Sequence, residues 1–338
     1  MPAVTDAARF TDWVATHANF EGAQLGARLS GGNSNVTQRV DTATGPLILR
    51  RPPDNAISAS AANGVRREYR VLRALQGVAP VPAAIALCEE RELLGQPFIL
   101  TGFVTGTAIT TQLPPAYADH PDTLRRIGEA LVDGIAAVHC ADWAQSGMEA
   151  SAPADYVPRQ IERWLKIRAT DRVRDLPDLE RVGAWLQQHL PAERAVGIIH
   201  GDFHLDNTLF DLQEPRLTAI IDWELSTIGD PLADLALMLA CWGPRTIDPP
   251  GFAFVQQVTR RPGVVSREQL AQRWAERTGH SIERLDYYLV FALWRLAAIV
   301  EGAYVLFHQG KVHDDYSRHL EYDVPALLRE AAQRACGD

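Results

Sequence analysis

The pattern of hydrophobic and polar positions changes near residue 104. Before that point, short apolar or alternating runs are separated by turn residues, which is typical of β-strands. Strands are predicted over residues 35–42, 46–50 and 97–104. One helix interrupts them at 63–76, where apolar residues from Val65 to Leu75 recur at helical spacing.

The rest of the chain is mostly helical in pattern. Helices are predicted over 122–143, 153–169, 179–190 and 229–242. Asp230 is placed to cap the last of these, with Pro231 at the favoured first helical position. Short strands interrupt the helices at 195–200, 207–211 and 217–222, and a turn at 212–216 joins the last two.

Composition and charge exclude several classes of protein. The 338 residues are 46% hydrophobic, as in a globular protein, and the formal net charge of -9 without a long basic run excludes nucleic acid as a partner. The four cysteines form no closely spaced pair, which excludes a zinc site or disulfide framework and favours a reducing cytoplasm. The first twenty residues lack the pattern of a secretory signal.

One late segment is apolar enough to be compared with a membrane span. Residues 287–307 have the required length, but Arg295 and Glu301 would be costly at the middle of a bilayer. We therefore predict a buried helix and no membrane partner.

The stretch "GIIHGDFHLDNTLFD" at 197–211 concentrates histidines and carboxylates. On a strand, its polar residues would share one face and resemble a set of metal ligands, namely His200, Asp202, His204 and Asp206. In a loop, each would have its own role. The strands predicted on both sides favour the loop.

The spacing within this loop carries a second signal. His200, Asp202 and Asn207 follow the kinase catalytic-loop pattern H-R-D-x-x-x-x-N, with glycine in place of arginine. Asp222 follows one hairpin later, where a kinase holds its magnesium-binding aspartate. Phosphoryl transfer needs an oriented nucleophile and metal-held phosphates, and these residue types supply both.

Together, "HGDFHLDN" and "IIDWELSTIGDPLADLA" resemble the aminoglycoside phosphotransferase and choline kinase superfamily. "LSGGNSNVT", "LILRRPP" and "REYRVLRAL" are most similar to the kinase-like domain fused to some acyl-CoA dehydrogenases. The resemblance implies an α+β, protein-kinase-like fold of two lobes. Residues 1–104 would form a small antiparallel-sheet lobe with one helix that binds nucleotide, and residues 105–338 a larger, mostly helical catalytic lobe.

The resemblance also implies roles for the loop residues. Asp202 would orient the substrate hydroxyl and accept its proton, while Asn207 and Asp222 would hold Mg²⁺. Two residues are expected to be structural: His200 would bond the loop backbone, and Asp234 would brace the loop from beneath. His204 either contacts substrate or faces solvent, and Asp206 is interpreted as a turn or capping residue.

The nucleotide-binding residues are less conventional. Gly31, Gly32, Asn33 and Ser34 form either a phosphate-binding turn or an ordinary hairpin turn. Arg50 stands where most of the superfamily has lysine, and Glu68 would pair either with it or with a neighbouring arginine. The backbone from Thr101 through Phe103 to Val104 would pair with adenine.

The implied function is an ATP- and Mg²⁺-dependent transfer of phosphate to a small-molecule hydroxyl. A hydroxy acid or hydroxyacyl-CoA is favoured over an aminoglycoside as acceptor. Arg295, inside the apolar helix, needs a partner, which is either a protein carboxylate or an anionic substrate.

Three other functions are weighed. Arg50 keeps the charge but is bulkier than lysine, which leaves a catalytically weak or inactive nucleotide-binding regulatory module as the alternative. Metal-dependent hydrolysis lacks further ligand pairs, and a protein kinase lacks an A-P-E element. The sequence leaves open ATP against GTP and the existence of a homodimer.

Overall fold

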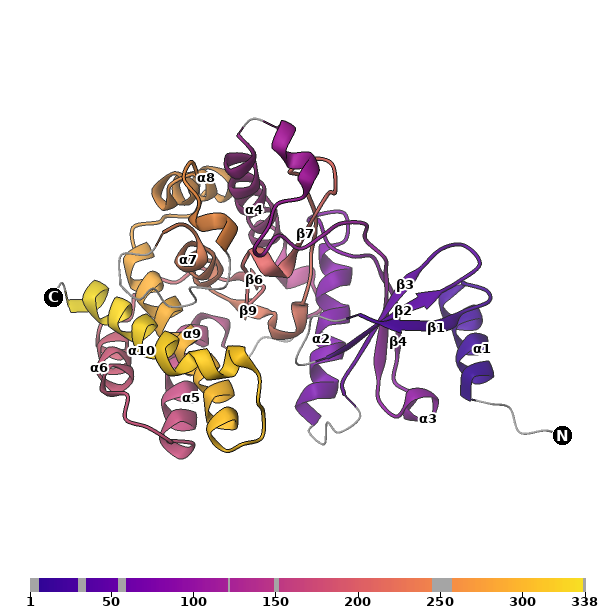
Figure 1. Ribbon diagram of the computed structural model, residues 1–338, viewed down its shortest axis with the longest axis horizontal. Coiled ribbons are helices and arrows are strands. Elements are labelled where there is room, and N and C mark those ends of the chain that lie inside the picture. Colours follow the sequence, from indigo (N-terminus) through magenta and orange to yellow (C-terminus); the bar gives the residue numbers. More distant parts are fainter. Residues whose placement is uncertain are drawn as a thin grey trace.

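A computed structural model describes residues 6–29, 35–53, 59–120, 122–148, 152–244 and 257–336. A part built on a β-sheet and a larger helical part lie side by side (Figure 1). This is the α+β fold predicted from the sequence. The division at residues 104 and 105 stays a prediction, although the sheet ends close to it, at Gly102.

The first part is built on a five-stranded antiparallel sheet with strand order β1-β2-β3-β5-β4. Its strands are β1 (Gln24–Arg28), β2 (Val36–Asp41), β3 (Leu47–Arg51), β4 (Ala84–Cys88) and β5 (Phe98–Gly102). Its helices are α1 (Asp6–Ala18), α2 (Ala59–Leu75) and the short α3 (Arg91–Leu94). Successive side chains of a strand point to opposite faces. On β3, Leu47 and Leu49 are therefore buried on one face, while Arg50 points to the other.

The prediction of a single helix in this part was wrong, because α1 and α3 accompany α2. α1 buries Phe10, Trp13 and Val14 against the sheet core, a spacing of three and four residues that forms one helical stripe. β1 and β4 were also not predicted. β1 is mostly exposed and lacks the apolar alternation that would have identified it.

The second part packs its helices around a single large core. They are α4 (Thr123–His139), α5 (Tyr156–Thr170), α6 (Pro177–Gln188), α7 (Pro231–Cys241), α8 (Arg267–Thr278), α9 (Leu285–His308) and α10 (Asp315–Cys336). Two short antiparallel pairs lie among them: β6 (Gly197–Ile199) with β9 (Thr227–Gly229), and β7 (Thr208–Phe210) with β8 (Leu217–Ile220). Asp230 caps α7 as predicted, since its side chain accepts from the N–H of Leu232.

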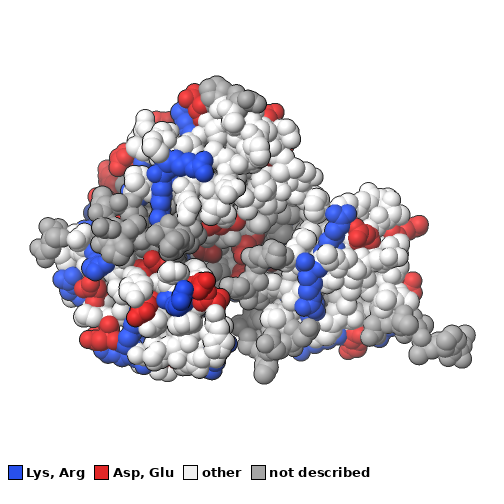
Figure 2. All heavy atoms as spheres, in the orientation of Figure 1, with Lys and Arg blue, Asp and Glu red and all other residues white. Residues whose placement is uncertain are grey.

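Within the described residues, α9 is the one helix long and apolar enough to cross a membrane. Of its most apolar window, 61% is buried inside the molecule, which is how a core helix behaves. The molecule is hollowed where the two parts meet, and acidic side chains are visible there (Figure 2).

Candidate active site

The loop between β6 and β7 depends on a glycine. Gly201 has φ +83°, and a Cβ at this position would lie 2.5 Å from the carbonyl oxygen of Leu225. Both the left-handed backbone and the close approach exclude any side chain. This explains the glycine that replaces arginine in the kinase pattern.

Asp234 holds this loop from α7. One of its carboxylate oxygens accepts from the N–H of His200 at 2.5 Å, and the other from the N–H of Gly201 at 2.8 Å. The side chain is buried and also faces His139 Nε2 at 3.4 Å. Trp274 Nε1 donates to His139 Nδ1 at 2.9 Å, so Nε2 carries the proton that points at Asp234.

His139 and Trp274 were not selected from the sequence. Both residues are buried, and they support the loop through Asp234 without contacting it. Each lies more than thirty residues from Asp234, and a single apolar-flanked His or Trp on a helix has no distinguishing pattern.

His200 ties the loop to the segment before Asp222. Its Nε2 lies 2.8 Å from the carbonyl oxygen of Ile221, and its Nδ1 accepts from the N–H of Asp202 at 3.2 Å. The ring thus bonds backbone on two sides, the type of contact expected from the sequence.

Asp202 is held by Asn207 and lies close to groups that lower its pKa. Asn207 Nδ2 donates to the Asp202 carbonyl at 2.8 Å and to its Oδ2 at 3.2 Å. Burial raises the pKa of Asp202, but the hydrogen bond and charge of His204, with the nearby His200 and Arg295, lower it to about 2. Asp202 is therefore a carboxylate at neutral pH.

Arg295 reaches the same loop from α9. Its Nη1 donates to the Gly201 carbonyl at 2.9 Å, and its Nε to Gln160 Oε1 at 3.4 Å. Among the described residues no carboxylate lies within ion-pair distance of it, so these residues do not supply the carboxylate partner that was one of its two expected alternatives. A backbone carbonyl accepts the hydrogen bond and leaves the positive charge unneutralised.

His204 lies between two carboxylates. Its Nε2 is 3.7 Å from Asp202 Oδ1, and its Nδ1 is 3.5 Å from Asp206 Oδ2. Burial lowers the pKa of His204, but the two aspartates raise it by more, to well above its usual value. The side chain is 19% exposed, so the expectation that it faces solvent was wrong.

Asp222 meets Arg50 across the hollow. Asp222 has φ 67° and ψ 56°, a left-handed conformation that costs energy for a residue with a side chain. Arg50 Nη2 lies 2.5 Å from Asp222 Oδ1, and Arg50 Nε lies 2.8 Å from Glu68 Oε1. Burial raises the pKa of Glu68 to about 7, although the charge of Arg50 opposes the shift.

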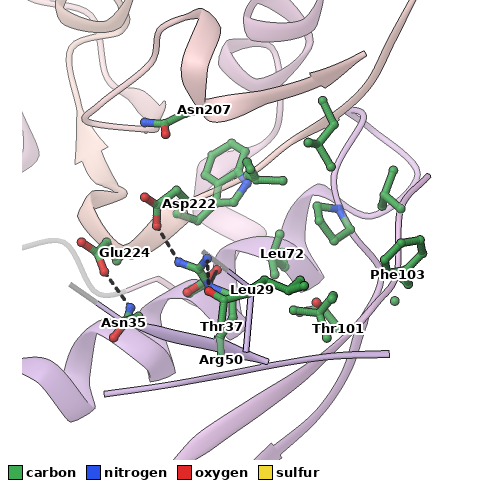
Figure 3. Close-up of a pocket in the computed structure, with 18 of the residues that line it drawn as sticks. Leu29, Asn35, Thr37, Arg50, Leu72, Thr101, Phe103, Asn207, Asp222 and Glu224 are labelled. Carbon is green, nitrogen blue, oxygen red and sulfur yellow. Dashed lines mark hydrogen bonds and ion pairs between the residues drawn. The ribbon is translucent and has the colours of Figure 1, made fainter. Parts of the chain in front are cut away.

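A cavity of about 390 Å³ lies between the two parts of the molecule. Figure 3 shows Arg50 and Asp222 pointing toward one another across it, with Thr101 and Phe103 at the other end. Val104, Glu68 and Asn207 also line it. Asp202, His204 and Arg295 are not among its lining residues, while Gly31, Gly32, Asn33 and Ser34 lie outside the described residues.

Several lining residues were not anticipated. They include Ile48, Leu72 and Trp223, which give the cavity apolar walls, and Asn35, whose Nδ2 donates to Glu224 Oε2 at 2.6 Å. The last contact links the residue before β2 to the turn after Asp222. Apolar strand and helix positions look the same in sequence whether they face a core or a cavity, so no signal distinguished them.

The donor set fits a hard cation. Asn207 points its amide nitrogen at Asp202, which leaves its carbonyl oxygen available, and Asp222 uses Oδ1 for Arg50, which leaves Oδ2. Magnesium takes few protein oxygens and completes its shell with water and phosphate oxygens. Within the described residues, no group of three or more His, Cys, Asp or Glu side chains is placed to hold a metal ion.

Comparisons with known proteins agree with this geometry. Residues 26–259 match the family described as "Phosphotransferase enzyme family". Among curated proteins, acyl-CoA dehydrogenase family member 10 of Mus musculus is 31% identical over 276 residues, covering 81% of this chain and 26% of that protein. The probable acyl-CoA dehydrogenase IBR3 of Arabidopsis thaliana is 30% identical over 292 residues, covering 81% and 35%. The chain thus spans only about a third or less of these relatives.

Solved structures share the whole fold. One described as a "putative aminoglycoside phosphotransferase" from Ralstonia eutropha JMP134 has 28% identity and a TM-score of 0.80, covering 96% of this chain and 97% of that one. Aminoglycoside phosphotransferase APH(4)-Ia, solved with AMP-PNP and hygromycin B, has 18% identity and a TM-score of 0.62, with 97% and 99% covered, and supports the fold alone. The resemblance seen in the sequence is confirmed. The chain belongs to the phosphotransferase enzyme family, and its fold supports small-molecule kinase activity in general.

Proposed function

We propose that this protein transfers the γ-phosphoryl group of ATP to a hydroxyl of a small molecule, with Mg²⁺ as cofactor. One observation carries the proposal. Asn207, hydrogen-bonded to Asp202, and Asp222 from the next hairpin line the same cavity as the Arg50–Glu68 ion pair. The parts that a kinase needs for nucleotide, cation and nucleophile are therefore adjacent.

Asp202 handles the acceptor hydroxyl. A carboxylate with a pKa of about 2 is a weak base, which suits a loose transition state in which little proton transfer has occurred when the phosphoryl group leaves. The acceptor oxygen bonds to the γ-phosphorus, the bond from that phosphorus to the β,γ-bridging oxygen breaks, and the hydroxyl proton passes to Asp202.

Asn207 and Asp222 would hold the cation through Oδ1 and Oδ2 respectively. Mg²⁺, when bound, neutralises charge on the phosphate oxygens. Arg50 would contact phosphate oxygens through its planar guanidinium, while Glu68 orients it. Arg50 must then release Asp222 Oδ1, or contact this oxygen and the phosphate at the same time.

The acceptor is proposed to be a hydroxy acid or a hydroxyacyl-CoA rather than an aminoglycoside. The acyl-CoA dehydrogenase names of the curated relatives support a carboxylate or thioester acceptor. So does Arg295, which lies next to the loop of Asp202 with no carboxylate partner among the described residues. The free cysteines are consistent with the proposed cytoplasmic location.

The test is an assay of nucleotide consumption with ATP and Mg²⁺ over a panel of hydroxy acids and hydroxyacyl thioesters. Asp202→Asn should lower kcat by roughly 10²–10⁴-fold, because the base is lost, while nucleotide affinity changes little. Asp211→Asn, just beyond the loop and outside the lining of the cavity, is the matched control. Full turnover by the Asp202→Asn variant would refute the mechanism.

A regulatory nucleotide-binding module is the second candidate, and the Arg50–Asp222 contact favours it. That ion pair occupies one oxygen of the predicted cation ligand, which opposes cation binding. This candidate predicts thermal stabilisation by nucleotide without turnover on the whole panel. Turnover on any acceptor would exclude it.

A further inference from the structure

A second cavity lies in the helical part, among the carboxyl end of α5, the start of α6 and the middle of α9. Its volume is about 250 Å³, and it shares no lining residue with the nucleotide cavity. Three of its lining residues are arginines: Arg168, Arg172 and Arg174. The three arginines differ in the hydrogen-bond and ion-pair partners that they have.

Two of the arginines are already paired. Arg174 contacts both oxygens of Glu301, at 3.0 and 2.5 Å, and donates to two backbone carbonyls of α10. Arg172 contacts Asp175 and Glu180. The carboxylates of Glu180 and Glu301, which also line the cavity, are therefore committed to these partners.

Arg168 is different. Its side chain is 8% exposed, yet its Nε and Nη1 have no hydrogen-bond partner among the described residues. The carboxylate within ion-pair range is Asp171, at 3.7 Å from Nη2, which is too long for a hydrogen bond, and Asp171 is half exposed. Burial lowers the pKa of Arg168, and the charges of Asp171 and Glu301 only partly oppose this. A buried guanidinium with unused donors is costly unless an acceptor reaches it.

The start of α6 forms another wall of the cavity. Its N-cap, Leu176, lines the cavity and provides no side-chain cap, and Pro177 is the first helical residue. The positive end of the helix dipole favours an anion, but Pro177 has no N–H, the Leu179 N–H donates to the Leu176 carbonyl at 3.0 Å, and Asp178 and Glu180 carry negative charge in the first turn. The start of α6 therefore closes one side of the cavity, and the donors for an anion come from Arg168.

We propose that this cavity binds a small oxyanion, a phosphate or carboxylate group, through Arg168, whose buried Nε and Nη1 have no hydrogen-bond partner among the described residues. A planar guanidinium offers donors that match the oxygens of either group. Gly302 of α9 leaves the guanidinium room, since a Cβ there would lie 3.6 and 3.8 Å from its terminal nitrogens. The site is independent of the proposed kinase activity.

The site lies along the same two helices that support the catalytic loop. Arg168 follows Gln160 by eight residues on α5, about 12 Å at 1.5 Å per residue, and Glu301 follows Arg295 by six residues on α9, about 9 Å. Gln160 and Arg295 contact each other, so the anion would be held on the far side of that contact from Gly201.

The test is calorimetric titration of the full chain with inorganic phosphate, and separately with acetate, at ionic strength balanced with potassium chloride. Saturable binding is expected in roughly the millimolar range, and Arg168→Met should weaken it about tenfold or more. Arg181→Met is the matched control, because Arg181 is exposed on α6 and pairs with Asp178 outside the cavity. Arg50→Met should leave this binding unchanged, which separates it from phosphate bound between the two parts.

A second variant keeps the proposal testable if Arg168→Met fails to fold. Asp171→Asn retains the guanidinium and removes the carboxylate beside it, so phosphate should bind several-fold more tightly. Equal binding by wild type and Arg168→Met, weaker binding by Asp171→Asn, or no saturable binding of either anion by wild type would overturn the proposal. Preference for phosphate or for acetate identifies the source of the oxyanion.

Discussion

The two sides of the catalytic loop are held by different kinds of contact. Beneath it, Asp234, His139 and Trp274 are buried, and each polar group faces a partner. On the cavity side, Asp222 is one-third exposed, adopts a strained backbone and is held by the charge of Arg50. A buried, satisfied network fixes one geometry, whereas an ion pair at a cavity, with a carboxylate that is partly exposed, can be exchanged for a ligand that enters the cavity. The contacts beneath the loop thus fix its position. On the cavity side, nucleotide and cation can compete with the Arg50–Asp222 ion pair.

The most disruptive change should be Asp234→Ala. It leaves the N–H groups of His200 and Gly201, and His139 Nε2, without their buried acceptor, and should cost roughly 3–5 kcal/mol of unfolding free energy. Urea denaturation measures this loss, and turnover should fall with it. The matched control is Asp286→Ala on the first turn of α9. A loss below about 1 kcal/mol would show that the contacts beneath the loop do not fix its position.

An intermediate effect is expected from His204→Gln, and it should depend on pH. The folded-state pKa of His204 is raised by Asp202 and Asp206, so its stabilising charge is fully present below the unfolded value of about 6.5. That stability is lost as pH rises through the raised folded pKa. The variant should therefore be destabilised by about 1–2 kcal/mol near pH 6 and by less at alkaline pH, as measured by urea denaturation. A difference that grows with pH would contradict the charged state of His204.

The smallest effect on stability should follow Arg50→Lys. Lysine keeps a charge beside Glu68 but lacks the fork that reaches Asp222 as well, so the unfolding free energy should change by about 1 kcal/mol or less. The effect should appear instead in the affinity for nucleotide and Mg²⁺, measured by calorimetry. If Arg50→Lys binds Mg²⁺ with nucleotide more tightly, the Arg50–Asp222 pair competes with the cation. Unchanged affinities for nucleotide and Mg²⁺ would show that the contacts on the cavity side of the loop are not exchanged for ligands.

The motif residues were predictable because their spacing carries chemistry. Asp202, Asn207 and Asp222 were selected from two patterns, and the structure brings Asn207 to Asp202 and to the cavity that Asp222 lines. Glu68 was expected to pair either with Arg50 or with a neighbouring arginine, and it lies in contact with Arg50. Local sequence was sufficient for Asp202, Asn207 and Asp222 because the loop and the hairpin are local structures.

The residues that were missed act over long distances in sequence. His139 and Trp274 meet Asp234 only because α4, α7 and α8 pack together, and no periodicity encodes that packing. Arg295 was recognised as a charge that needs a partner, but its partner is a backbone carbonyl, which carries no sequence signal. A sequence pattern identifies a polar side chain that needs a partner, and the tertiary structure decides which group becomes that partner.

Gly201 has a consequence for how this protein can change over evolutionary time. Its backbone approaches Leu225, three residues beyond Asp222, so closely that no side chain fits between them. The loop of Asp202 and the turn of Asp222 therefore touch main chain to main chain, beside the contact of the His200 ring with the Ile221 carbonyl. Substitutions that leave Gly201, His200 and Asp234 in place keep these contacts, so substrate preference can drift while the phosphoryl-transfer geometry stays constant.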